Sequence, residues 1–192
     1  MTEQQLTSIF SDYPHRSLTF PDGIRAAVLC PVFIQDNQPH LLFIKRSQQV
    51  KHHKGEISFP GGIKEPDDRS LLETCLRETM EEVGIQQQDI TIIGRLDDVD
   101  TTTGFLVSPF LGIISYPYPF ILNEQEVDHL VTVPIKDFID ASSQFDFYYF
   151  DGRHLMPLVA YYLGGQVIWG ATARIVERLV TLLRQHNLLP AA

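Results

Sequence analysis

The sequence predicts an α/β fold in which a mixed β-sheet is sandwiched between α-helices. About seven segments have the apolar patterns of strands, two have the period of amphipathic helices, and the two kinds do not alternate regularly. The 192 residues, 44% of them apolar and 20% charged, are enough to form one hydrophobic core. We therefore expect a single domain over residues 1–192, with its core at about residues 24–186.

The strands are indicated by apolar runs that end at turn residues. Ile24 to Ile34 and His40 to Lys45 are separated by polar turn residues, a pattern that predicts a hairpin. Two further strand segments are expected in "DITIIGRLDDVDTT" and "FLVSPFLGIISYP", the second ending near Pro117. The run "FDFYYFDGRHLMPLVAYYLGGQVIWG" predicts a hairpin that turns at Asp151-Gly152, followed by a strand around Gln166 to Trp169.

The helices are indicated by apolar residues at helical spacing. A helix from Ser70 to Val83 is predicted by Leu72, Leu76, Met80 and Val83. Ser70 with Glu73 fits a capping box at its start, and Gly84 suits the cap at its end. The segment "ATARIVERLVTLLRQHN" should form a closing amphipathic helix, and "VTVPIKDFIDASS" contains a short helix or turn.

Charge and composition exclude several classes of protein. A net charge of −9 argues against general binding of nucleic acid or of an anionic membrane, because the summed field repels polyanions. No apolar run approaches the roughly 20 residues that span a bilayer, and the N-terminus lacks the layout of a secretory signal, so a cytoplasmic location is expected. Cys30 and Cys75 have neither metal-ligand nor disulfide-framework spacing, and we interpret both as reduced core residues.

One segment of this acidic chain is basic. Between His40 and Gly55 there is no acidic residue, whereas Lys45, Arg46, Lys51 and Lys54 all occur there. The segment is either a solvated loop or a local site for a small anion.

The helix from Ser70 to Val83 concentrates negative charge. Glu78, Glu81 and Glu82 span roughly 100° of its surface, opposite the apolar stripe, and like charges at this spacing repel. One interpretation is a solvated acidic face, moderated by Arg77. The other is a site for Mg²⁺ or Mn²⁺, since these ions prefer oxygen ligands and bridge to phosphates. The preceding "FPGG" favours the second, because glycine lets the backbone approach a ligand closely.

The segment "GGIKEPDDRSLLETCLRETMEEVGI" resembles the Nudix box. Its second half, Arg77 to Ile85, matches R-E-U-X-E-E-X-G-U with one exception, since Thr79 stands at an apolar position U. The first half departs from the usual form: Asp68 stands where glutamate is expected, and eight residues rather than seven precede Arg77.

The longer spacing is similar to that of the coenzyme A diphosphatase branch of the Nudix hydrolases. That branch carries an upstream motif LLTXRSX₃RX₃GX₃FPGG, which "LFIKRSQQVKHHKGEISFPGG" resembles. Three positions differ, since Phe43, Ile44 and Lys51 replace the expected leucine, threonine and arginine. "TTGFLVSPFLG" and "LNEQEVDHLVTVPIKDF" are similar to other stretches of the family.

The resemblance implies a Nudix fold and a metal-dependent hydrolase that cleaves the pyrophosphate of coenzyme A to 3′,5′-ADP and 4′-phosphopantetheine. Glu78, Glu81 and Glu82 would hold Mg²⁺ or Mn²⁺. Arg77 would orient these carboxylates. Glu81 is favoured as the general base, and Glu126 would be the base instead, an additional ligand or a surface residue. The residues expected to bind substrate are Arg46, Lys51, Gly61 and Gly62.

Other functions stay open at this level. A Nudix core also fits hydrolysis of ADP-ribose, NADH or a nucleoside triphosphate, and a non-catalytic Nudix-like module is a further alternative. The expected partner is a small nucleotide substrate, and a homodimer is possible.

Overall fold

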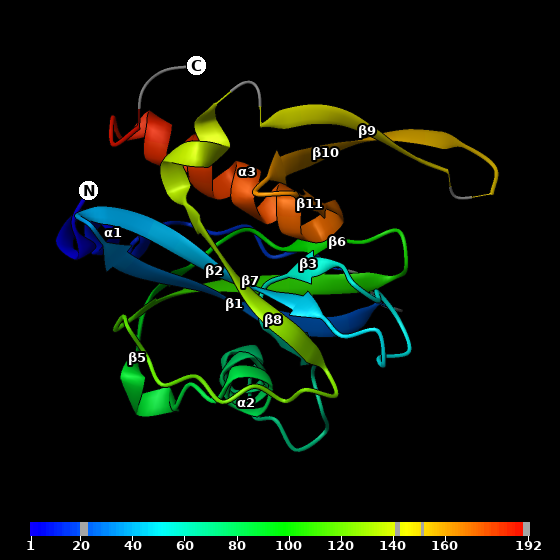
Figure 1. The fold of residues 1–192 in the computed structure, drawn as a ribbon, viewed down its shortest axis with the longest axis horizontal. Helices are drawn as coiled ribbons and strands as arrows, with labels where there is room; N and C mark the ends of the chain where they lie inside the picture. Colours follow the sequence, from blue (N-terminus) through cyan, green and yellow to red (C-terminus); the bar gives the residue numbers. More distant parts are fainter. Residues whose placement is uncertain (20–22, 141–142, 151, 190–192) are drawn as a thin grey trace.

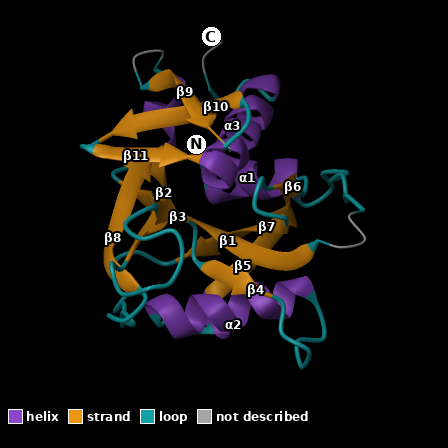
Figure 2. Cartoon of the chain, turned by 90° about the vertical axis from the view of Figure 1, so that its right-hand side faces the viewer, coloured by secondary structure: helices purple, strands orange, loops and turns teal. Residues whose placement is uncertain are grey.

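The computed structural model describes residues 1–19, 23–140, 143–150 and 152–189. A large mixed sheet forms the middle layer, with helix α2 on one side and helices α1 and α3 on the other (Figures 1 and 2). This arrangement confirms the predicted fold class.

The large sheet is built around two long parallel strands, β1 (Ile24–Gln35) and β7 (Phe105–Ile114). Its main path has the order β3-β2-β1-β7-β5, and every neighbouring pair other than β1 and β7 is antiparallel. The outer strands of this path are β2 (Gln38–Arg46), β3 (Ile57–Ser58) and β5 (Ile90–Arg95). Three further strands pair at its margins, β4 (Gly61–Ile63) with β1, β6 (Val99–Asp100) with β7, and β8 (Val127–Pro134) with β2.

Helix α2 (Leu71–Val83) begins and ends where the sequence predicts. The Ser70 hydroxyl accepts a hydrogen bond from the Glu73 N–H, and Gly84 caps the end with a φ of 76°. The predicted capping box is only half formed, because the Glu73 carboxylate accepts from the N–H of Arg69 rather than of Ser70. The helix packs on β1 and β4 and closes one of the two apolar cores.

The opposite face of the sheet carries α3 (Gly170–Gln185) and α1 (Glu3–Phe10). Helix α3 is the predicted closing helix. Helix α1 was not predicted. It has eight residues and buries only Leu6 and Phe10, too few apolar positions to show a helical period.

A second, three-stranded antiparallel sheet of order β11-β10-β9 extends past α3 (Figure 1). Its strands are β9 (Gln144–Phe150), β10 (Leu155–Leu163) and β11 (Gln166–Trp169), which confirms the predicted hairpin and third strand. Asp151, at the expected turn, lies outside the described residues.

Some boundaries differ from the prediction. "DITIIGRLDDVDTT" forms two strands, β5 and β6, and β7 ends at Ile114 rather than near Pro117. "VTVPIKDFIDASS" starts within β8 before a short 3-10 helix, η2 (Ile135–Ile139), and a second such helix, η1 (Gln87–Asp89), precedes β5. In the part of the chain that the structure describes, no helix has both the length and the apolarity needed to cross a bilayer.

Candidate active site

A cavity of about 1140 Å³ opens beside the acidic helix. Its lining comes from helix α2, from β4 of the large sheet, and from β9–β11 with the start of α3. Helix α2 and the second sheet lie on opposite sides of the large sheet (Figure 2). Its charged lining comes from segments far apart in the sequence, and its aspartate, glutamate, lysine and arginine residues are Arg46, Lys51, Glu56, Glu65, Glu78, Glu82, Asp100, Glu126 and Arg174.

The two glycines of "FPGG" form part of this lining as strand β4. Gly61 has a φ of 149°, and a Cβ there would lie 2.6 Å from the Cα of Val28, so the strand approaches β1 more closely than another residue allows. A Cβ on Gly62 would lie within 2.6 Å of both carboxylate oxygens of Glu78. The absence of a Cβ therefore lets Gly61 pair closely with β1 and leaves space at Gly62 for the Glu78 carboxylate.

Glu82 lies behind Gly61 and is buried, with only 2% of its surface exposed. One of its oxygens accepts a 2.9 Å hydrogen bond from the Gly61 N–H, and the other lies 3.7 Å from Arg46 Nη1. Burial raises the pKa of Glu82 to about 8, despite these two partners. The protein therefore holds a carboxylate whose charge it does not fully compensate.

Two more carboxylates add to this local negative charge. Burial also raises the pKa of Glu78, and the charge of Glu126 acts in the same direction on both Glu78 and Glu82. Among the described residues, no three acidic, histidine or cysteine side chains already form a metal-ligand cluster. The donors nevertheless fit a hard divalent cation, because they are carboxylate oxygens with an excess of negative charge beside a cavity.

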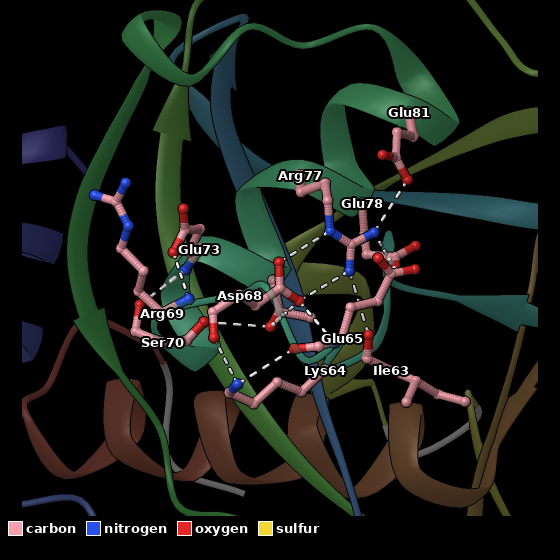
Figure 3. A network of polar contacts seen from close by, with 11 residues as sticks. Ile63, Lys64, Glu65, Asp68, Arg69, Ser70, Glu73, Arg77, Glu78 and Glu81 are labelled. Atoms are coloured by element: carbon pink, nitrogen blue, oxygen red, sulfur yellow. Dashed lines mark hydrogen bonds and ion pairs between the residues drawn. The ribbon is translucent and has the colours of Figure 1, made fainter.

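Arg77 holds the outer part of the acidic helix in a network of polar contacts (Figure 3). Its Nη1 donates to Glu78 at 2.9 Å and to Glu81 at 3.1 Å. Its Nε and Nη2 donate to the two oxygens of Asp68, both at 3.0 Å. One guanidinium thus fixes three carboxylates, which its planar fork of donors allows.

Asp68 is the centre of that network rather than part of the cavity. Its Oδ2 also accepts from the Glu65 N–H and the Thr74 hydroxyl, both at 2.8 Å. Hydrogen bonding by Arg77 holds the pKa of Asp68 well below its usual range. Sequence reasoning left this role open, because Arg77 is nine residues away and that spacing matches no helical pair.

The acidic face of α2 differs from its predicted geometry. Glu82, expected on the exposed side, is buried, whereas Met80, expected in the apolar stripe, is 44% exposed. The reason is that β4 and the Arg46 region cover one flank of the helix, which the helical period alone does not reveal. Glu81 is 47% exposed and faces Arg77.

The substrate-binding candidates come together from several elements. Arg46, Lys51, Gly61 and Gly62 all line the cavity, and so does Glu126 from the loop before β8. Sequence reasoning left Tyr149 undecided between the core and a substrate pocket, and it gave Trp169 no role in the site. Both residues line the other side of the cavity and stack with their ring centroids 6.1 Å apart. No local pattern links them, because they lie on different strands of the second sheet.

Comparison with known proteins identifies the family. Residues 23–157 match the family described as the NUDIX domain. This chain is a Nudix protein. It is 37% identical over 158 residues to a protein of Yersinia enterocolitica named uncharacterized Nudix hydrolase NudL, covering 80% of this chain and 78% of that protein. The family assignment supports a hydrolase, and Nudix hydrolases generally use divalent metals such as Mg²⁺ or Mn²⁺.

Solved structures share the Nudix fold at low sequence identity. An Ap4A hydrolase of C. elegans in a binary complex aligns with a TM-score of 0.55 and 18% identity, over 85% of this chain and 96% of that one. The NUDIX domain of Shewanella oneidensis NrtR, complexed with ADP ribose, aligns with a TM-score of 0.51 and 16% identity, over 97% of this chain and 99% of that one. At this identity the likeness concerns the fold alone.

Proposed function

We propose that this Nudix hydrolase cleaves the pyrophosphate of coenzyme A, or of its acyl derivatives, to 3′,5′-ADP and 4′-phosphopantetheine. The observation that carries the proposal is the meeting of two motifs at one cavity. Arg46, from the segment that resembles the upstream coenzyme A motif, lies 3.7 Å from Glu82 of the Nudix helix. Lys51 of the same segment lines the same cavity.

The size and lining of the cavity are sufficient for a substrate of the size of coenzyme A. Sites for small ligands usually measure about 300–1,000 Å³, and this cavity measures about 1140 Å³. Its charged part combines carboxylates with Arg46 and Lys51, as a metal-bound diphosphate would require.

The charged residues of the two motifs have proposed roles, whether they line the cavity or, like Glu81 and Arg77, lie outside its lining. Glu78, Glu81 and Glu82 would hold Mg²⁺ or Mn²⁺, which when bound would neutralise the diphosphate and lower the pKa of a water molecule. Arg77 keeps Glu78 and Glu81 in position without lining the cavity. Arg46 and Lys51 would bind substrate phosphates, and Gly61 and Gly62 would let the diphosphate approach the backbone.

Two residues, Glu126 and Glu81, are candidates for the general base. Glu126 is half-buried and lines the cavity, whereas Glu81 is engaged by Arg77. A base must come within hydrogen-bond reach of the attacking water. We therefore assign the base to Glu126, with Glu81 as a metal ligand.

The assignment is tested by identifying the products from a panel of substrates. With Mg²⁺ or Mn²⁺, coenzyme A should give 3′,5′-ADP and 4′-phosphopantetheine by mass spectrometry. The panel should include ADP-ribose, NADH and a nucleoside triphosphate, since ADP ribose is bound by the NUDIX domain of NrtR. If ADP-ribose or NADH is hydrolysed at least as efficiently as coenzyme A, only the general Nudix assignment survives.

The 3′-phosphate provides a sharper test. Coenzyme A and dephospho-coenzyme A differ only by this group, and Lys51 is an exposed cation at the cavity. A charge-assisted contact of about 1.5–3 kcal/mol corresponds to roughly ten- to a hundredfold in kcat/KM. We expect wild type to prefer coenzyme A, and Lys51→Ala to weaken this preference more than it slows hydrolysis of the dephospho form.

Lys54→Ala is the matched control for Lys51→Ala. Lys54 belongs to the same segment and is also exposed, but it does not line the cavity. The control should keep the preference of wild type. Arg46→Ala is a less specific probe, because Arg46 contacts Glu82 and its loss should slow both substrates.

A further inference from the structure

The side of the cavity opposite the carboxylates has a different chemistry. Three neighbouring strands each contribute one apolar side chain to it, namely Tyr149 from β9, Leu158 from β10 and Trp169 from β11. All three are partly exposed, so their surfaces are available to a ligand in the cavity. We call these three residues the apolar wall.

The pairing of the second sheet explains why these residues share a surface. Trp169 lies opposite Ala160 in the register of β10 and β11. Leu158 is two residues before Ala160 and therefore points to the same face of the strand. Tyr149 stacks on Trp169 at an interplanar angle of 27°. Ile175 of α3 continues the apolar lining behind them.

The one ion pair at this end of the described cavity lining is internally compensated. Arg174 donates to the carboxylate of Asp100 at 2.9 Å and to the carbonyl oxygen of the same residue at 2.6 Å. This pair therefore adds little net charge, in contrast to the carboxylates around Glu82. The cavity therefore combines a group of carboxylates without full compensation, on helix α2, with an apolar surface on the second sheet.

We propose that the apolar wall binds the uncharged pantetheine arm of the substrate. This inference rests on the proposed function and adds the direction in which coenzyme A lies. The 3′-phosphate belongs to the nucleotide half, which is attracted to the cations around Lys51. With the diphosphate at the carboxylates and the nucleotide half at Lys51, the apolar wall is the part of the cavity lining that we assign to the arm.

The shape of the wall favours an aliphatic arm over a nucleobase. The rings of Tyr149 and Trp169 are 6.1 Å apart, too close for a base to stack between them. The partly exposed aliphatic side chain of Leu158 completes a wall that suits methyl and methylene groups.

The first test compares two substrates that share the nucleotide half. Coenzyme A carries the pantetheine arm, whereas adenosine 3′-phosphate 5′-diphosphate keeps the 3′-phosphate and the anhydride but lacks the arm. Tyr149→Ala should lower kcat/KM for coenzyme A by about tenfold and change that for the truncated substrate by less than about twofold. Leu158→Asn should act in the same direction.

Tyr162→Ala is the matched control. Tyr162 is another tyrosine of the second sheet, 58% exposed, and it does not line the cavity. It should leave both substrates as in wild type. An equal loss on both substrates with Tyr149→Ala, or no loss on either, would overturn the inference.

A second test needs no turnover. Trp169 is the only tryptophan in the chain, so its fluorescence reports on the wall directly. 4′-Phosphopantetheine should change its emission, whereas 3′,5′-ADP should leave it nearly unchanged. The reverse result would overturn the inference. Failure of wild type to hydrolyse coenzyme A, together with a response to 4′-phosphopantetheine, would reject the proposed reaction and keep the arm-binding wall.

Discussion

Asp68 and Glu82 lie at the two ends of the acidic helix segment and are both buried, yet their surroundings act in opposite ways. Asp68 accepts hydrogen bonds from a guanidinium, a hydroxyl and a backbone N–H, and its pKa is lowered. Glu82 has one backbone N–H and a cation at 3.7 Å, and its pKa is raised to about 8. The comparison teaches that hydrogen bonds compensate the charge of Asp68, whereas the charge of Glu82 is left partly uncompensated, as the proposed role of metal ligand requires.

The largest effect is expected from Glu82→Gln, which tests the proposed metal-binding role of Glu82. Glu82→Gln keeps the shape of the side chain but removes the charge that would hold the metal. We expect kcat/KM to fall by about a thousandfold or more, since metal-based charge stabilisation contributes several kcal/mol. The metal-free variant should be as stable as wild type or slightly more so, as measured by urea unfolding in EDTA. Loss of stability with activity intact would show instead that Glu82 is structural.

The second expectation concerns the pH dependence of stability without metal. The pKa of Glu82 rises from 4.5 to about 8 on folding, so the folded state holds a proton that the unfolded state releases between these values. The free energy of unfolding should therefore fall by a few kcal/mol as pH rises from about 5 to 8, at about 1.4 kcal/mol per pKa unit. Urea unfolding across this range should show the slope in wild type and a weaker one in Glu82→Gln. Equal slopes would refute the assignment.

A third prediction concerns the hydrogen bonds between Asp68 and Arg77. Asp68→Asn removes the carboxylate that receives two hydrogen bonds from Arg77. We expect a loss of about 2 kcal/mol in stability, which lowers Tm by about 4–8 °C. Activity should fall by about tenfold, because Arg77 then holds Glu78 and Glu81 less firmly. Calorimetry and steady-state kinetics measure the two effects, and an activity loss as large as that of Glu82→Gln would remove the contrast between the two ends.

The smallest expected effect comes from Gly62→Ala. The added methyl group would displace the Glu78 carboxylate, which is the movable end of a side chain. We expect kcat/KM to fall by about tenfold with Tm changed by no more than about 3 °C. Gly61→Ala is the informative comparison, because its Cβ would meet the backbone of β1 and should reduce stability more. Equal losses of stability in the two variants would contradict this reading of the two glycines.

The difference between the two ends also shows what the sequence could reveal. Helix α2 was predicted almost to the residue, because Ser70 and Gly84 are local signals that act within one turn of the helix. The burial of Glu82 depends on Gly61, 21 residues earlier, and no local pattern encodes that contact.

Long-range pairing also limited the prediction of the rest of the site. The charged residues could be named from motifs, but the apolar wall depends on the register of β9, β10 and β11. The role of Asp68 depends on a loop that folds back onto Arg77. Helix α1 was not predicted, because its two buried residues, Leu6 and Phe10, are too few to show a helical period of apolar residues.

The Gly61 N–H donates a 2.9 Å hydrogen bond to Glu82, the carboxyl group whose pKa is raised to about 8. The amide proton of Gly61 is therefore in direct contact with this group. The amide resonance of Gly61 is thus a built-in NMR sensor. Its proton chemical shift should move when Glu82 loses its proton, and move again when a divalent cation shares the carboxylate. One isotope-labelled glycine could therefore follow proton and metal occupancy in the same sample.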